Sequence, residues 1–113
     1  MNITSFQVLA DPTRLHIVEL LRAREHAVNE LVARMAIQQS GVSRHLRILE
    51  EAGFVQTRAA GNKRLYALRP ERFIELDQWV TQYRRLWMAR LDAFGEALEQ
   101  RQARRVQRRR RSR

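Results

Sequence analysis

The sequence predicts a mainly α-helical domain with one small β-hairpin, and three patterns of residues predict it. Apolar residues recur every three or four positions along several segments, as in amphipathic helices. Two short runs of β-favouring residues surround a Gly-Asn pair, which is typical of a hairpin turn. A long final segment keeps the helical spacing from Pro70 to about Gln100. At 113 residues, the chain has the length of one small domain.

The first helices can be placed from their start signals. A short amphipathic segment surrounds Phe6 and Leu9, and it can pack on its own domain or on a partner. The next helix starts at Asp11-Pro12-Thr13, because aspartate caps free amides and proline suits a first helical turn. This helix should run to about Arg24, and Glu25-His26-Ala27 should be a connector.

A short break separates the third and fourth helices. The third is expected from about Asn29 to Met35 and the fourth from about Gln39 to Ala52, with Gly53 placed to end it. The break at Ala36-Ile37 leaves room only for a tight turn between packed helices. Two helices joined in this way form a helix-turn-helix, whose second helix can enter a DNA major groove.

The fourth helix divides into two faces at about 100° per residue. Val42, Leu46 and Leu49 form an apolar anchor face. The opposite face is polar and basic, and it comprises Gln39, Ser40, Ser43, Arg44 and Arg47. Arginine can read guanine, glutamine can read adenine, and serine can bind a base edge or a phosphate. We expect the first four of these residues near base edges and Arg47 at a phosphate. His45 lies beside the apolar face, where phosphate contact and partly buried packing stay equally open.

The hairpin is basic near its tip, where it carries Arg58, Asn62, Lys63 and Arg64. Charges of one sign favour a wing that lies along the phosphate backbone or in the minor groove. The alternative is a hairpin whose charges only protect its edge. The alternative for the fourth helix is an ordinary solvated amphipathic helix that does not read DNA. The tight turn and the basic hairpin together favour DNA reading.

The final helix carries more apolar surface than a domain of this size can cover. One stripe steps by three or four residues through Phe73, Leu76, Val80, Tyr83, Trp87, Leu91, Phe94 and Leu98. Packing against a second copy is the simplest solution. The expected dimer interface comprises Phe6, Leu9, Leu76, Trp79, Val80, Tyr83, Leu86, Trp87, Leu91 and Phe94. A monomer with a frayed, solvated helix end, and an aromatic cofactor pocket, are the weaker alternatives.

The net charge of +10 suggests a polyanionic partner, and its distribution is uneven. Residues 101–113 carry eight arginines and no acid, whereas residues 1–100 carry 14 basic against 12 acidic residues. We therefore expect two parts: a DNA-binding and dimerisation domain in residues 1–100, and a disordered arginine-rich tail in residues 101–113. The tail could add DNA affinity without sequence preference by releasing counterions.

Several classes of function are disfavoured by what the sequence lacks. Without cysteine it has no disulfide, thiolate metal site or thiol redox sensor. No signal pattern or membrane-spanning apolar run is present, so a cytoplasmic, nucleoid-associated protein is expected. A glycine-rich phosphate loop and an acid–base cluster are also absent, so we expect neither an enzyme nor a bound cofactor.

Three segments of the sequence resemble the ArsR/SmtB family of winged helix-turn-helix repressors. They read LADPTRLHIVELL, ELVARMAIQQSGVSRHLRILEEAGFV and RAAGNKRLYAL, and the likeness covers about residues 5–98. The resemblance implies a homodimer, with the first and last helices at its interface, that represses by binding an imperfect palindrome near a promoter. It also implies that the fourth helix is the recognition helix, with Ser43, Arg44 and His45 in its DNA-contacting signature.

The chain departs from the metal-sensing members of that family. Glu30-Leu31 is followed by Val32-Ala33-Arg34, where those members commonly carry cysteines, and the final helix has no histidine. We therefore expect no metal site, and a closer similarity to metal-free, autorepressor-like members. A small-molecule-responsive regulator and a protein-docking module are the alternatives, and the sequence does not identify any effector.

Overall fold

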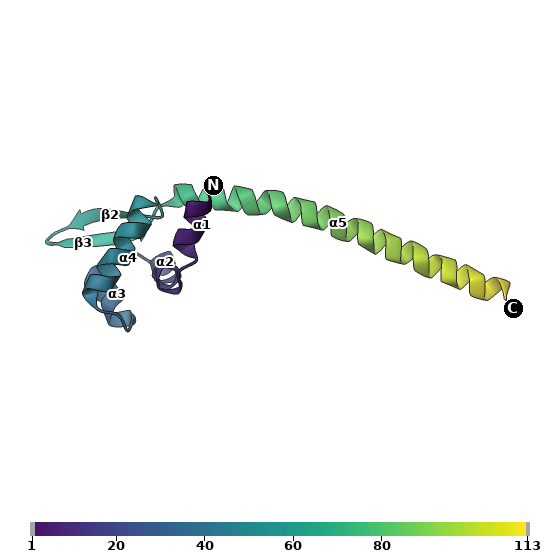
Figure 1. Ribbon diagram of the computed structural model, residues 1–113, viewed down its shortest axis with the longest axis horizontal. Coiled ribbons are helices and arrows are strands. Elements are labelled where there is room, and N and C mark those ends of the chain that lie inside the picture. The colour runs from purple at the N-terminus through teal and green to yellow at the C-terminus, as the bar shows by residue number, and fades with distance from the viewer. Residues whose placement is uncertain (1, 113) are drawn as a thin grey trace. The chain divides into compact units, whose positions relative to one another are not determined.

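The computed structural model describes residues 2–112, and Figure 1 shows the order of the elements along this part of the chain. The elements are α1 (Ile3–Leu9), α2 (Pro12–Ala23), β1 (His26–Ala27), α3 (Val28–Arg34), α4 (Gln39–Glu51), β2 (Val55–Ala60), β3 (Lys63–Leu68) and α5 (Pro70–Arg111). Two compact units divide after Leu76, so that α5 begins in the first unit and makes up the second.

The core of the first unit is built around α4, which packs against α2, α3 and β2. The anchor face predicted from the sequence is confirmed, because Val42, Leu46 and Leu49 are all fully buried. Burying each of these side chains contributes roughly 1.5–3 kcal/mol. Ile17 and Phe54 are equally buried and contribute to the same core. The polar face of α4 is thereby held outward by its own apolar face.

The α2 helix begins as predicted, at an aspartate cap. The Asp11 side chain accepts hydrogen bonds from the backbone amides of Thr13 at 2.9 Å and of Arg14 at 3.0 Å. These amides, that of Arg14 foremost, hold the pKa of Asp11 below its ordinary value. On the same helix Ile17, Val18 and Leu21 are buried, whereas Leu15 remains 48% exposed.

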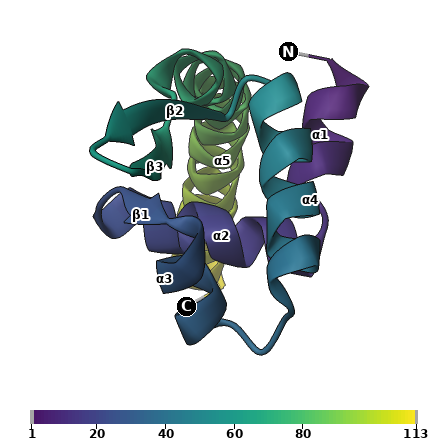
Figure 2. The same ribbon diagram turned by 90° about the vertical axis from the view of Figure 1, so that its left-hand side faces the viewer.

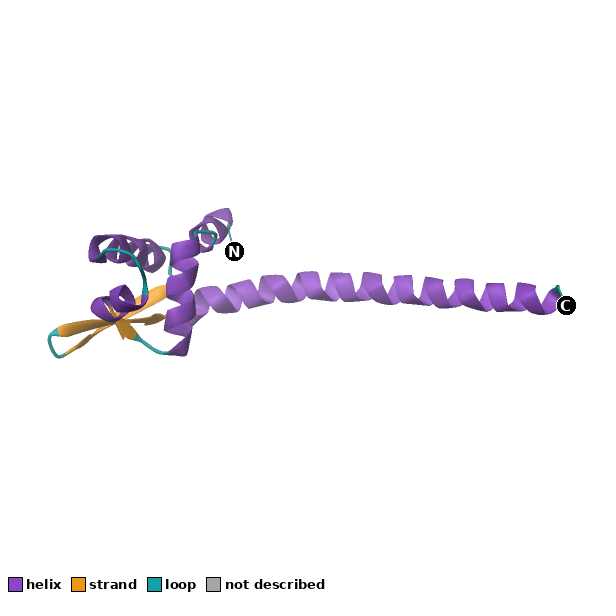
Figure 3. Ribbon diagram, turned by 90° about the horizontal axis from the view of Figure 1, so that it is seen from below, coloured by secondary structure: helices purple, strands orange, loops and turns teal. Residues whose placement is uncertain are grey.

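The sheet has three antiparallel strands in the order β1-β3-β2, rather than only the two of the predicted hairpin. Figure 3 shows the strands in orange. The additional strand is β1, in the segment expected to be a connector, where His26 pairs with Tyr66 and Ala27 with Leu65. A strand of two residues has no periodicity of its own, so only its pairing with β3 reveals it. Gly61 has a φ of 63° at the hairpin turn, the glycine position of a type II′ turn.

The α5 helix continues to Arg111, although the sequence predicted an end near Gln100 followed by disorder. The extension contains no glycine or proline between residues 101 and 111, and arginine, glutamine and alanine are good helix formers. Cations in the last turn also interact favourably with the helix dipole. Among residues 2–112, none of the helices has the length and apolar character needed to cross a bilayer.

Candidate nucleic-acid interface

The polar face of α4 is accessible in the structure. Figure 2 shows α4 beside α3, to which a short loop connects it. Gln39, Ser40, Arg44 and Arg47 are exposed, and Ser43 is half-buried. Neither arginine forms an ion pair with any described residue. Their guanidinium groups can therefore bind an acceptor without first breaking an ion pair with a carboxylate.

A glycine allows close packing at the turn before α4. A Cβ at Gly41 would lie 2.9 Å from Cγ2 of Ile37, closer than real contacts allow. The bare backbone at Gly41 thus lets Ile37 pack against the first turn of the helix. The sequence alone does not indicate this role, because a glycine inside a helix gives no sign of which residue packs against it.

The C-terminal end of α4 is fixed by a Schellman motif. The amide of Gly53 donates to the carbonyl of Glu50 at 3.0 Å, and that of Phe54 donates to the carbonyl of Leu49 at 2.9 Å. Gly53 takes a φ of 84°, which confirms the predicted stop. Buried Phe54 and Leu49 supply the apolar contact that accompanies this motif. The direction in which β2 leaves α4 is set by these bonds.

Arg14 joins α1 to α4, a role that its position in the sequence does not indicate. Its Nε donates to the carbonyl of Val8 at 2.7 Å, and its Nη1 lies 3.3 Å from Nδ1 of His45. Because a guanidinium can only donate, a hydrogen bond here requires Nδ1 to accept, which leaves Nε2 as the ring nitrogen that can donate. Half-buried His45 therefore takes part in an internal contact and still keeps one N–H donor.

The predicted cations of the wing fall into two groups. Arg58 is paired with Glu25 through its Nε, at 2.9 Å, and through Nη2. The hydrogen-bonded Arg58 guanidinium holds the pKa of Glu25 below its usual range, and Glu25 raises the pKa of Arg58. Lys63 and Arg64, by contrast, are exposed and have no ion pair among the described residues. Asn62 is exposed beside them at the turn.

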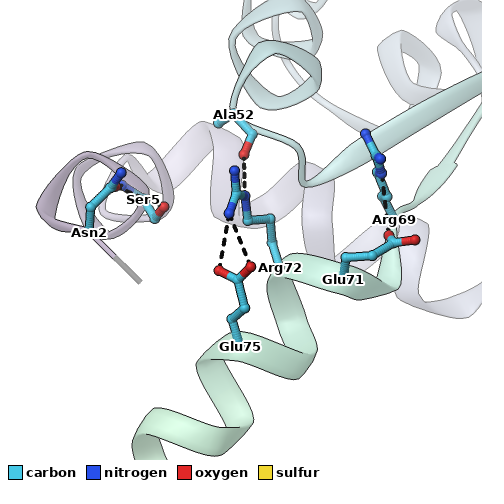
Figure 4. A network of polar contacts seen from close by, with 7 residues as sticks. All are labelled: Asn2, Ser5, Ala52, Arg69, Glu71, Arg72 and Glu75. Atoms are coloured by element: carbon cyan, nitrogen blue, oxygen red, sulfur yellow. Dashed lines mark hydrogen bonds and ion pairs between the residues drawn. The ribbon is translucent and has the colours of Figure 1, made fainter.

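A second guanidinium connects α4 to the first turns of α5, as Figure 4 shows. Arg72 Nε donates to the carbonyl of Ala52 at 3.2 Å, and its Nη1 lies 3.1 Å from Glu75 Oε2. The same region contains an edge-to-face contact between Phe54 and Phe73, with ring centroids 5.4 Å apart. The start of α5 is therefore attached to the end of the recognition helix.

The residues expected at a dimer interface differ in exposure. Phe6, Leu9 and Leu76 are half-buried, and Leu9 packs against the core. The remaining residues lie on α5 and are between 37% and 63% exposed: Trp79, Val80, Tyr83, Leu86, Trp87, Leu91 and Phe94. The rings of Trp79 and Tyr83 contact each other in a tilted arrangement, with centroids 4.5 Å apart and planes at 40°. The second unit thus presents a large uncovered apolar surface.

A helix-turn-helix anchored by one buried face and followed by an antiparallel wing, with exposed cations on both, defines the class of winged helix-turn-helix DNA-binding proteins. The chain belongs to the ArsR family of bacterial regulatory proteins, whose family model matches residues 11–57. It is therefore a transcriptional regulator and not an enzyme.

Individual relatives support this membership. The chain is 35% identical over 95 residues to the HTH-type transcriptional regulator Rv2034 of Mycobacterium tuberculosis, covering 84% of this chain and 86% of the relative. It is 35% identical to a transcriptional repressor SmtB homolog of Synechocystis, over 69% of this chain and 59% of that one.

Solved structures show the same fold. A possible transcriptional regulator for arsenical resistance has a TM-score of 0.65 at 36% identity, covering 73% of this chain and 85% of that one. The homodimeric winged helix-turn-helix domain of Mb0332 from Mycobacterium bovis has a TM-score of 0.59 at 28% identity, covering 70% and 76%.

Proposed function

We propose that this protein is a homodimeric repressor that binds an imperfect palindrome near a promoter. The observation that carries the proposal is the set of exposed cations on α4 and at the wing tip that form no ion pair with another residue between positions 2 and 112. A carboxylate partner would compete with phosphate for these groups, as Glu25 does for Arg58. Acting on promoters would place the protein in the cytoplasm, at the nucleoid.

In this proposal α4 lies in the major groove and the wing contacts the backbone. Base edges are read by the first turns of α4, through Gln39, Ser40, Ser43 and Arg44. Backbone contacts come from Arg47 and from the wing residues Asn62, Lys63 and Arg64. His45 supports α4 through Arg14 and offers its Nε2–H to a phosphate. Arg58 is the weakest member of the predicted set, because a contact with DNA would require it to leave Glu25.

A second copy of the chain is the proposed partner of the apolar surface on α5. The similar Mb0332 domain is homodimeric, which supports the proposed dimer. The arsenical resistance operon repressor of Staphylococcus xylosus, 37% identical over 68 residues, supports the proposed repressor role. A symmetric dimer would place two recognition helices in successive major grooves, about one helical turn apart.

Release from DNA is proposed to occur without a metal-sensing site. The chain has no cysteine, and α5 has no histidine with which to build the sites of metal-responsive members. Among residues 2–112, no three histidine, aspartate or glutamate side chains gather as a ligand group. A small-molecule or protein effector is compatible with this proposal, and its chemistry is not specified by the residues described above.

Selecting bound sequences from random duplex DNA tests the proposal. We expect an imperfect palindrome whose half-sites lie about one helical turn apart. Arg44→Ala should weaken binding to that site by roughly 1–3 kcal/mol and relax the base preference at one position. Arg22→Ala is the matched control, because Arg22 is an exposed arginine on α2, paired only with Glu19 at the surface. Equal behaviour of the two variants would contradict the assignment of α4 as the reading helix.

A further inference from the structure

The arginines at the end of α5 are segregated on one side of the helix. Projected at about 100° per residue, six of the seven arginines between positions 101 and 111 fall within an arc of roughly 160°. We call this surface the arginine face, and it comprises Arg101, Arg104, Arg105, Arg108, Arg109 and Arg111. The opposite side carries Gln102, Ala103, Val106, Gln107 and Arg110.

The arginine face has no internal counter-charge. All of its residues are exposed, and none forms an ion pair with another residue between positions 2 and 112. Residues 101–111 contain no acid at all. Four of the side chains, those of Arg101, Arg104, Arg105 and Arg108, line one shared groove along the helix. These positions are three, four and seven apart, so like charges are neighbours and repel one another.

We propose that the arginine face binds the phosphate backbone of duplex DNA as a helix, adding contacts to those of the winged helix-turn-helix without reading bases. This inference rests on the proposed DNA-binding function. Phosphate matches the chemistry of the site, since guanidinium groups bind phosphate oxygens bidentately and the repulsion between neighbouring arginines is relieved when phosphates neutralise them. Each neutralised phosphate releases counterions and steepens the salt dependence of binding.

The composition of the opposite side argues against a membrane surface as the partner. Helices that lie in a bilayer interface present large apolar side chains such as Trp, Phe and Leu opposite their basic side. Here only Ala103 and Val106 are apolar, beside glutamines and one further arginine. The gathering of arginines on one side also distinguishes the arginine face from a solvated charged tail. In such a tail, the order of the residues would not affect DNA binding.

A variant that keeps the charge but redistributes it tests this idea. It exchanges two neighbouring pairs in the full-length chain: Arg105→Val with Val106→Arg, and Gln107→Arg with Arg108→Gln. Composition and net charge stay the same, while two guanidinium groups leave the arginine face. We expect weaker binding to a long duplex without an operator, and a log–log salt slope smaller by about two, at roughly 0.9 per phosphate contact. The sequence selected from random DNA should be unchanged.

Two single variants keep the test decisive if the exchange disturbs the helix. Arg108→Gln removes a charge from the arginine face, and Arg110→Gln removes the same charge from the opposite side. Arg108→Gln should lower the salt slope by about one, and Arg110→Gln should leave it nearly unchanged.

Two kinds of result would overturn the inference. Equal salt slopes for the native chain and the exchange variant, or for Arg108→Gln and Arg110→Gln, would show that only total charge matters. Tighter binding to phosphatidylserine vesicles than to duplex would assign the surface to lipid headgroups. If the native chain selected no preferred sequence, the proposed repressor function would fail, whereas the on-face and off-face comparison on random duplex would still decide the role of the arginine face.

Discussion

Arginines in the first unit fall into two kinds, which the structure separates by their partners. Arg14, Arg58 and Arg72 are engaged with His45, Glu25 and Glu75, respectively, and they connect elements or stabilise turns. Arg44 on α4 and Arg64 on the wing have no such partner among the described residues. Arginines of the first kind are expected to affect stability and geometry, and those of the second kind to affect DNA binding.

Replacing Glu25 with glutamine should change how stability depends on pH. The carboxyl of Glu25 has a lowered pKa because it accepts hydrogen bonds from Arg58, so its contribution is present above the unfolded value of 4.5. That contribution is lost as pH falls through the still lower pKa of the folded state. We expect the native chain to be more stable than Glu25→Gln near neutral pH, and the difference to shrink below about pH 4.5. Thermal unfolding over a pH series measures both.

Asp11 and Glu30 also have lowered pKa values, but they are present in both proteins and cancel in the comparison. A difference between the two proteins that stayed constant from neutral pH to about pH 3 would show that the Glu25–Arg58 ion pair does not stabilise the fold.

At the scale of elements, contacts within the protein hold α4 in place at both of its ends. Its first turn lies against Ile37 across Gly41, and its last turn closes through Gly53. Arg72 then attaches Ala52, at the end of α4, to α5. Because recognition depends on the angle at which a helix enters the groove, these contacts set binding geometry as well as stability.

Gly53→Ala and Gly95→Ala should change stability in opposite directions. Gly53 has a φ of 84°, and a Cβ there would lie 3.1 Å from Nε of Arg72. The left-handed conformation alone should cost Gly53→Ala about 1–2 kcal/mol. Gly95 lies inside α5, and nothing lies within 4 Å of an added Cβ. Gly95→Ala should therefore stabilise the helix by about 0.5–1 kcal/mol. Chemical denaturation of both variants gives the two values, and a destabilised Gly95→Ala would indicate that the position is covered in the assembled protein.

At the scale of the whole molecule, the uncovered apolar surface of α5 is the feature that favours association with a partner. Trp87, Leu91 and Phe94 are each more than half exposed on a helix of 42 residues. A monomer would leave this surface in water, at a cost of roughly 25 cal/mol for each Å² of apolar area. Pairing with a second copy would remove this cost and supply the two-fold symmetry that a palindrome requires.

Leu91→Glu should shift the protein from dimer to monomer, because it places a carboxylate within the apolar stripe. Gln78→Glu adds the same charge to an exposed position on the polar side of α5, outside the expected interface, and should leave the dimer intact. Sedimentation velocity measures both, and operator affinity should fall only for Leu91→Glu. A native chain that sediments as a monomer would favour α5 as a docking surface for another protein.

Prediction from the sequence succeeded where the signal lies within a single element. The Asp11 cap, the anchor face of α4 and the stop at Gly53 each depend on residues close together in the chain, and the structure confirms all three. The predicted end of α5 near Gln100 was wrong, because arginine, glutamine and alanine favour helix and α5 continues to Arg111. The DNA contacts and the dimer interface stay predictions, to be decided by the experiments above.

The sequence by itself determined the helices, the polar face of α4 and the family resemblance, because periodicity and capping are local properties of the chain. Tertiary structure alone decided that His26 and Ala27 form a strand, that Arg58 is held by Glu25, and that Arg14 reaches His45. These partners lie between 31 and 40 residues apart in the sequence, so no local pattern indicates that they pair. They meet only because packing of the core brings their elements together. That packing separates the arginines that support the fold from those that form no ion pair within residues 2–112.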